Sequence, residues 1–126
     1  IFARALRERG VDVVDCSSGG LAGSATAARS PRSPGFQVPF AEAIRREASI
    51  ATMAVGLIID ASQAEQVLKS GAADLVAIGR EALYNPNWPL HAEEALGAAG
   101  QFRSWPSQYG WWLERRAREL AACKAN

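Results

Sequence analysis

The stretch Ala73-Asp-Leu-Val-Ala-Ile-Gly-Arg-Glu81 decides the fold class of this chain. It contains the uninterrupted apolar run Leu75–Ile78, which lacks the alternation of a half-exposed strand. Such a run is typical of a strand buried on both faces, as in a parallel sheet. It ends at Gly79 and Arg80, where glycine lets the backbone approach a ligand closely and arginine offers a rigid fork of hydrogen-bond donors.

From this stretch alone, two interpretations of the Gly79-Arg80 turn stay open. Phosphate sites at the carboxyl ends of parallel strands need these two properties together. A buried strand followed by a glycine turn and a surface arginine would have the same sequence. The rest of the chain has to decide between them.

Composition limits the function classes. The 126 residues suit one modest domain, and 48% of them are hydrophobic, which is enough for a core. The net charge of +1 favours neither nucleic acid nor a membrane surface, and no apolar run approaches the ~20 residues that span a bilayer. The two cysteines, Cys16 and Cys123, form no metal motif or disulfide framework, so we expect a reducing, cytoplasmic setting.

The order of predicted elements indicates an α/β fold with a parallel sheet and right-handed crossovers. Three strands alternate with two helices, and the first strand follows a helix that already begins at Ile1. We therefore expect the chain to be a piece of a longer protein. The strands are Val11–Asp15, Ile50–Val55 and Ala73–Ile78, and the helices between them are Pro39–Ala48, with Phe40 and Ile44 as its apolar stripe, and 62–70.

Local signals predict where the helices begin and end. Ser62-Gln-Ala-Glu65 has the pattern of a capping box, and Gly71 follows that helix in the position that favours glycine. Asn85-Pro86 predicts the start of the next helix, with Asn as the N-cap. A last, highly charged helix is expected over Leu113–Ala122.

Several chemically interesting residues have ordinary explanations. Cys16 at a strand end is expected to be a small buried hydrophobe, and His91 a surface residue of a helix. Trp88 fits either core packing or a ligand-facing wall. The aromatic residues beside arginine near the end of the chain favour an oligomer contact or a pocket wall over a nucleic-acid site, because the net charge is low.

Four blocks of sequence, in order, resemble the carboxyl-terminal part of the Old Yellow Enzyme family. The resemblance covers nearly the whole chain and is greatest for the bacterial branch of NADPH dehydrogenases and xenobiotic reductases. The blocks are Val11–Gly19 (VDVVDCSSG), Gly35–Arg45 (GFQVPFAEAIR), Thr52–Gly56 (TMAVG) and Ala73–Glu81 (ADLVAIGRE) with Asn85-Pro86.

The resemblance implies a (β/α)₈ TIM barrel that binds FMN, with this chain supplying about strands six to eight and a tail at about residues 101–126. In the family, backbone amides after strands seven and eight hold the FMN phosphate, which corresponds to Gly56, Gly79 and Arg80 here. That placement agrees with the general position of phosphate sites in such barrels. The catalytic residues of the family would lie upstream, so none is assigned to this chain.

The tail adds a second implication of the resemblance. It is similar to a carboxyl terminus that completes an active site, often in the neighbouring subunit, so a homo-oligomer is expected. Trp111 or Trp112 would line the substrate pocket, and Trp88 resembles another of its walls.

For the complete parent, the resemblance implies reduction of an activated alkene, with NADPH or NADH as reductant and FMN as hydride carrier. Two alternatives remain open. Another FMN- or phosphate-binding TIM-barrel enzyme could use the same glycine turns, or the chain could be an inactive truncated fragment.

Overall fold

The computed structural model describes residues 1–18, 32–97 and 102–124, in two compact units that divide after Pro86. The two units are described separately. Gly19, at the end of the first family-like block, and residue 101, at the start of the predicted tail, lie outside the described residues.

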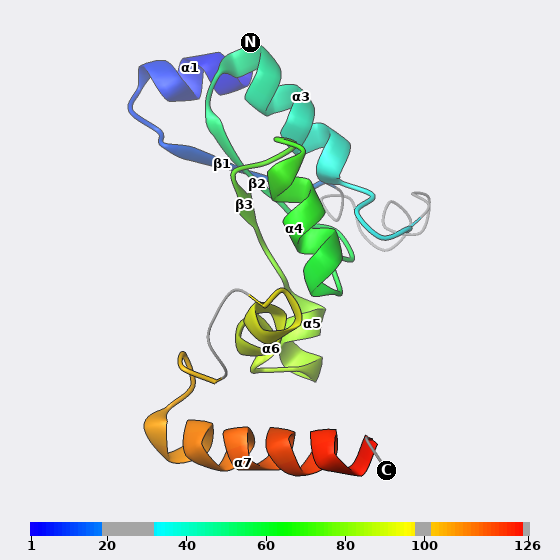
Figure 1. Ribbon diagram of the computed structural model, residues 1–126. Helices are drawn as coiled ribbons and strands as arrows, with labels where there is room; N and C mark the ends of the chain where they lie inside the picture. The colour runs from blue at the N-terminus through cyan, green and yellow to red at the C-terminus, as the bar shows by residue number, and fades with distance from the viewer. Residues whose placement is uncertain (19–31, 98–101, 125–126) are drawn as a thin grey trace. The chain divides into compact units, whose positions relative to one another are not determined.

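The first unit is built on a three-stranded parallel sheet with the strand order β1-β2-β3 (Figure 1). This confirms the predicted alternation of strands and helices, although each strand is shorter than predicted. In chain order the elements are α1 (Phe2–Glu8), β1 (Val13–Cys16), α3 (Val38–Ala48), β2 (Ala51–Ala54), α4 (Ala61–Lys69), β3 (Leu75–Val76) and α5 (Arg80–Tyr84).

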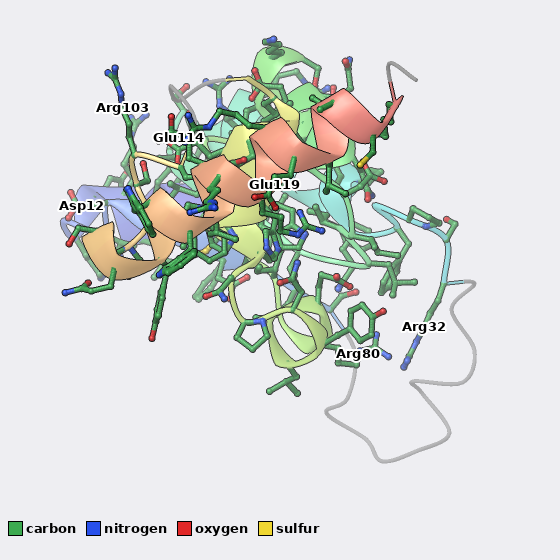
Figure 2. All side chains as sticks on the ribbon, turned by 60° about the horizontal axis from the view of Figure 1, so that its bottom comes forward. Asp12, Arg32, Arg80, Arg103, Glu114 and Glu119 are labelled. Carbon is green, nitrogen blue, oxygen red and sulfur yellow. The ribbon has the colours of Figure 1, made fainter. Side chains whose placement is uncertain are left out.

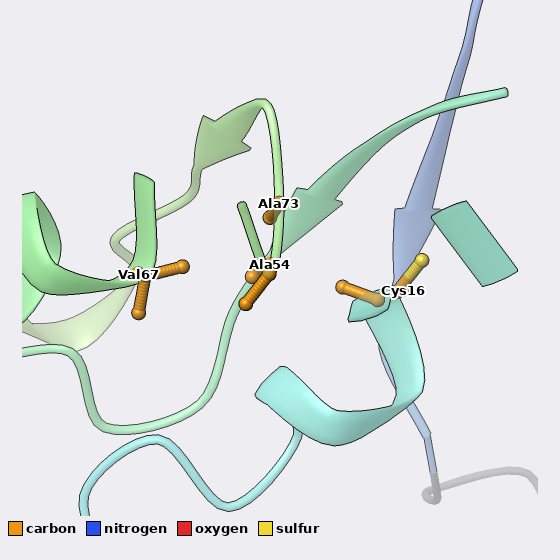
Figure 3. Packing of buried hydrophobic residues seen from close by; sticks show 6 residues of the cluster. Cys16, Ala54, Val67 and Ala73 are labelled. Atoms are coloured by element: carbon orange, nitrogen blue, oxygen red, sulfur yellow. The ribbon is translucent and has the colours of Figure 1, made fainter. Parts of the chain in front are cut away.

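One face of the sheet carries the core. Cys16 and Val76 flank Ala54 in the strand register, and the residues around Ala54 pack against Ala41 of α3 and Val67 of α4 (Figure 3). Small side chains at these positions let both helices approach the sheet closely. The resulting cluster is thin, so many larger apolar residues remain partly accessible.

The opposite face of the sheet has little cover from the described residues. Asp15, Met53 and Leu75 form a row across the three strands, and Leu75 is 48% exposed. The prediction that the third strand is buried on both faces is therefore wrong for the described part of the chain. The helices between the strands pack on the other side, through Ala41 and Val67.

Two predicted helix starts are also wrong. Helix α4 is capped by Asp60, whose carboxylate accepts hydrogen bonds from the Gln63 amide at 2.9 Å and the Ser62 hydroxyl at 2.8 Å. Ser62 thus lies inside the first turn, because a carboxylate two residues earlier takes the capping position. Helix α6 (Trp88–Ala95) likewise begins after Asn87 and not at Pro86.

Helix α3 begins with a proline in its first turn, as predicted, but its apolar stripe is shifted. Phe40 is 49% exposed, whereas Ala41 and Ala48 are buried and Ile44 packs against the core. The larger side chain therefore does not mark the buried side of this helix. The space between α3 and the sheet is filled by the small side chain of Ala41.

A polar contact on the edge of the first unit joins three elements. The Arg45 guanidinium donates to Asp74 at 2.9 Å and to the Gly71 carbonyl at 3.1 Å, and the same Asp74 oxygen accepts from the Thr52 amide at 3.0 Å. The Arg45 side chain remains 42% exposed. The contact fastens α3 and the start of β3 to β2.

The second unit contains α6 and the long helix α7 (Ser107–Lys124), which begins earlier than predicted. Glu94 accepts from the Phe102 amide at 2.8 Å, and Glu93 accepts from the Ser104 hydroxyl at 2.8 Å. The exposed His91 ring lies 5.3 Å from the Trp105 ring. Among the helices that the structure describes, none has the length and apolar character needed to cross a bilayer.

The Asp74 contact predicts a dependence of stability on pH. The hydrogen bond from Arg45, with the Thr52 amide next, lowers the pKa of Asp74. Its stabilising contribution is therefore complete above the unfolded-state pKa of ~3.9 and is lost as the pH falls through the lower folded-state pKa. We expect Asp74→Asn to lower the urea midpoint at pH 7 and the difference from wild type to shrink on acidification.

The matched control is Asp12→Asn, which changes an exposed carboxylate in the link before β1 (Figure 2). Its urea midpoint should follow that of wild type across the same pH range. An Asp74→Asn protein with the wild-type pH profile would show that the contact adds nothing to stability.

Candidate anion-binding site at the carboxyl end of the sheet

Parallel pairing brings the turns after β2 and β3 to the same edge of the sheet. The two turns line one open cavity of about 360 Å³, which includes Gly56, Gly79 and Arg80 among its lining residues. The three residues that the sequence assigned to a phosphate site therefore lie together. A ligand at the carboxyl ends of parallel strands is the general arrangement in α/β folds.

Gly56 is required by the fold. Its φ of +122° lies where residues with side chains are strained, and a Cβ atom there would lie 3.1 Å from the Phe36 ring and 3.2 Å from the Gln37 side chain. Its carbonyl accepts a hydrogen bond from the Gly35 amide at 2.8 Å. The turn after β2 is thus packed closely against the segment before α3.

Gly79 differs from Gly56 in the sign of its φ angle and in its packing. Its φ of −107° is negative, and a Cβ atom there would meet no atom of the described residues within 4 Å. Packing against the described part of the chain does not require glycine at this position. The missing side chain leaves free space on the wall of the cavity, which is the property that a close approach of a ligand to the backbone needs.

Arg80 begins α5 and is exposed (Figure 2). Glu81, the next residue, lines the same cavity, so the described lining carries one positive and one negative group. The positive charge can pair with an anion through the guanidinium fork. The neighbouring carboxylate weakens the local field, so backbone amides would have to supply much of the attraction.

The end of β1 contributes a further backbone contact beside the cavity. The Ser18 amide donates to the side-chain oxygen of Gln37, which itself lines the cavity. Cys16, two residues earlier, is 4% exposed, and burial, with the nearby Asp15 carboxylate second, raises the pKa of its thiol. The low exposure confirms the prediction that Cys16 is a small buried residue. The raised pKa of the thiol also disfavours the reactive thiolate.

The three tryptophans assigned to a substrate pocket lie in the second unit. Trp88 begins α6 and is half-buried, while Trp111 and Trp112 are 56% and 61% exposed on α7. The Trp111 and Trp112 rings pack edge to face with their centroids 4.4 Å apart, and the Arg115 guanidinium carbon lies 5.9 Å from the centroid of the Trp112 ring. Their role as pocket walls stays a prediction.

Sequence reasoning missed two glutamines beside the site. Gln37 is 7% exposed, and Gln63 of α4 makes two hydrogen bonds to the turn after β2. The available signal for Gln37 was a polar residue inside the apolar segment Phe36–Phe40. Gln63 carried no such signal, because it lies in a stretch that also fits an ordinary helix start.

Comparison with known proteins identifies the family. Residues 1–98 match the NADH:flavin oxidoreductase / NADH oxidase family. The chain belongs to this family. The resemblance seen in the sequence is thereby confirmed at the level of the family, and the matched segment contains the whole first unit with its candidate site.

Several relatives of this chain carry the name NADPH dehydrogenase. One from Geobacillus sp. (strain WCH70) is 52% identical over 96 residues, which is 76% of this chain and 27% of the relative. One from Geobacillus thermodenitrificans is 51% identical over 112 residues, 87% of this chain and 31% of the relative. One from Bacillus subtilis is 51% identical over 95 residues, 75% of this chain and 27% of the relative. The chain thus spans less than a third of these relatives.

The contrast between the two glycines predicts unequal effects of the same substitution on stability. Gly56→Ala should lower the free energy of unfolding by about 1–3 kcal/mol, because it combines strain with close contacts. Gly79→Ala should change it by less than about 0.5 kcal/mol. Urea unfolding of both variants and wild type measures the difference. Equal losses for the two variants would contradict the assignment of free space to Gly79.

Proposed function

We propose that this chain is the carboxyl-terminal portion, about strands six to eight, of the (β/α)₈ barrel of an FMN-dependent NADPH dehydrogenase that reduces activated alkenes. Within that enzyme the first unit binds the phosphate end of FMN. The observation that carries the proposal is the free space at Gly79, next to Arg80, on a cavity that the Gly56 turn also lines.

The residues present fit a phosphate group. The cavity volume of about 360 Å³ lies within the usual range for small-molecule sites. An unsubstituted backbone at Gly79 allows hydrogen bonding at close range, and Arg80 adds a permanent positive charge. Glu81 is the one carboxylate among the described lining residues, and its opposing charge makes the backbone contribution more important.

The geometry of the sheet supports the proposal of a barrel. All three strands are parallel, and the row of Asp15, Met53 and Leu75 on its second face is only partly covered by the described residues. In a closed barrel, side chains on the face away from the helices fill the interior. The relatives are more than three times as long as the matched segments, which is long enough to supply the other strands.

Bound FMN supplies hydride transfer, from NADPH or NADH to the β-carbon of an alkene such as an enone, with a proton added at the α-carbon. The part of this chain is to hold the cofactor in place. Gly56, Gly79 and Arg80 orient its phosphate end, and the proton donor and the groups that polarise the alkene lie elsewhere in the parent.

The second unit is proposed to take part in the substrate pocket and in assembly. Trp88, Trp111 and Trp112 would line the pocket. The exposure of Trp111 and Trp112 supports a contact with a second copy of the chain, because large apolar side chains on a surface commonly mark an interface. We place the parent enzyme in the cytoplasm.

Flavin binding by the full-length parent tests the proposal. The wild-type parent should purify with flavin absorbance and oxidise NADPH in the presence of cyclohexenone. Gly79→Val should raise the dissociation constant of FMN about tenfold or more, since branched carbons would enter the space meant for phosphate. Gly79→Ala should give a smaller rise. Unchanged affinity in the valine variant, measured by flavin fluorescence, would contradict the site.

Arg80 provides a second test that separates charge from shape. Arg80→Gln should weaken FMN binding by about tenfold, the loss expected for a hydrogen bond to a charged group. The loss should diminish at high salt, because the attraction of an exposed charge is screened. Arg46→Gln, which removes an exposed arginine of α3, is the matched control and should bind FMN like wild type. Equal affinity of the two variants would remove Arg80 from the site.

A further inference from the structure

We propose that Gln37 and Gln63 are positioning residues that fix the turn after β2 from two sides and so shape the phosphate site in advance of binding. The inference rests on the proposed function and deepens it. Neither glutamine is assigned a contact with the cofactor. Their role is to hold the backbone of Gly56–Ile59, which lines the cavity.

Gln63 holds one side of the turn with both ends of its amide. Its Nε2 donates to the Leu57 carbonyl at 3.1 Å, and its Oε1 accepts from the Ile59 amide at 3.0 Å. A single side chain from α4 therefore bridges a donor and an acceptor two residues apart. Only an amide side chain can make both bonds, since a carboxylate lacks the donor.

The turn that Gln63 holds has an uncommon backbone conformation. Leu57 has a φ of +51°, which is unusual for a residue with a side chain and persists where the surroundings hold it in place. The neighbouring Ile58 is 3% exposed and anchors the turn by burial. The hydrogen bonds of Gln63 flank this anchor on both sides.

Gln37 packs against the other side of the turn and bonds the end of β1. Its Oε1 accepts from the Ser18 amide at the end of β1, and its Cβ and Cγ atoms lie 3.2 Å from the position of a Cβ on Gly56. The Gly35 amide adds a hydrogen bond to the Gly56 carbonyl at 2.8 Å. The segment before α3 thus joins the ends of β1 and β2.

The physical benefit of this arrangement is preorganisation. A backbone that already has its binding conformation loses no further conformational freedom when an anion arrives, so more of the interaction energy appears as affinity. Glutamine also suits the position because it is neutral. It fixes the backbone without repelling a phosphate or competing with it.

The experiment replaces each glutamine by methionine, which keeps the length of the side chain and removes its hydrogen bonds. In the full-length parent, Gln63→Met should speed amide hydrogen exchange at Ile59, and Gln37→Met should speed it at Ser18. Each should also weaken FMN binding about three- to tenfold, the range expected for a neutral hydrogen bond. Urea unfolding of the same variants reports any global loss of stability.

Two further variants separate positioning from general destabilisation. Gln66→Met changes an exposed glutamine on the same helix and should leave exchange at Ile59 and FMN affinity at wild-type values. Gln63→Glu keeps the acceptor for the Ile59 amide and should restore much of its slow exchange. Its hydrogen bond to the Leu57 carbonyl stays lost.

Faster exchange with unchanged FMN affinity would overturn the inference, because the glutamines would then be purely structural. Unchanged exchange in Gln63→Met and Gln37→Met would overturn it as well. A wild-type parent that fails to bind FMN is a different result, and it overturns the proposed function together with the assignment of these residues to a flavin site.

Discussion

The candidate site depends on the parallel pairing of β2 with β3. The register aligns Met53 with Leu75 and Ala54 with Val76, so the two strands end at the same edge of the sheet. The turns that follow, at Gly56 and Gly79, are separated by a whole helix and strand in sequence and yet line one cavity. An antiparallel pairing of the same segments would send the two turns to opposite edges, and no shared site could form.

The two glycines of the site show that the same residue type can serve two different purposes. Gly56 meets a demand of the fold, because its backbone conformation and its neighbours both exclude a side chain. Gly79 has a negative φ, and the described residues place no atom within 4 Å of a Cβ there. A glycine that packing does not require leaves room for a ligand to approach the backbone closely.

Both neutral and charged groups line this cavity. Arg80 and Glu81 bring opposite charges to the described lining, whereas the hydrogen bonds to the turn after β2 come from the Gln63 amide. A dianionic phosphate would therefore be met by one cation and by oriented dipoles. Fixed dipoles are effective only while the backbone keeps its shape, so the stability of the turn would affect the affinity of the proposed site for an anion.

The sequence by itself determined the alternation of elements, the parallel sheet and the family, and it predicted the three residues of the candidate site, because apolar runs, glycine turns and the family-like blocks are local patterns. It misplaced the start of α4, where Asp60 takes the cap from Ser62, and it overestimated the burial of Phe40 and Leu75. Tertiary structure alone decided which side chains reach across elements: the Arg45–Asp74 contact and the hydrogen bonds of Gln37 and Gln63. These contacts join residues from different elements, and their distances follow from packing that no local pattern encodes.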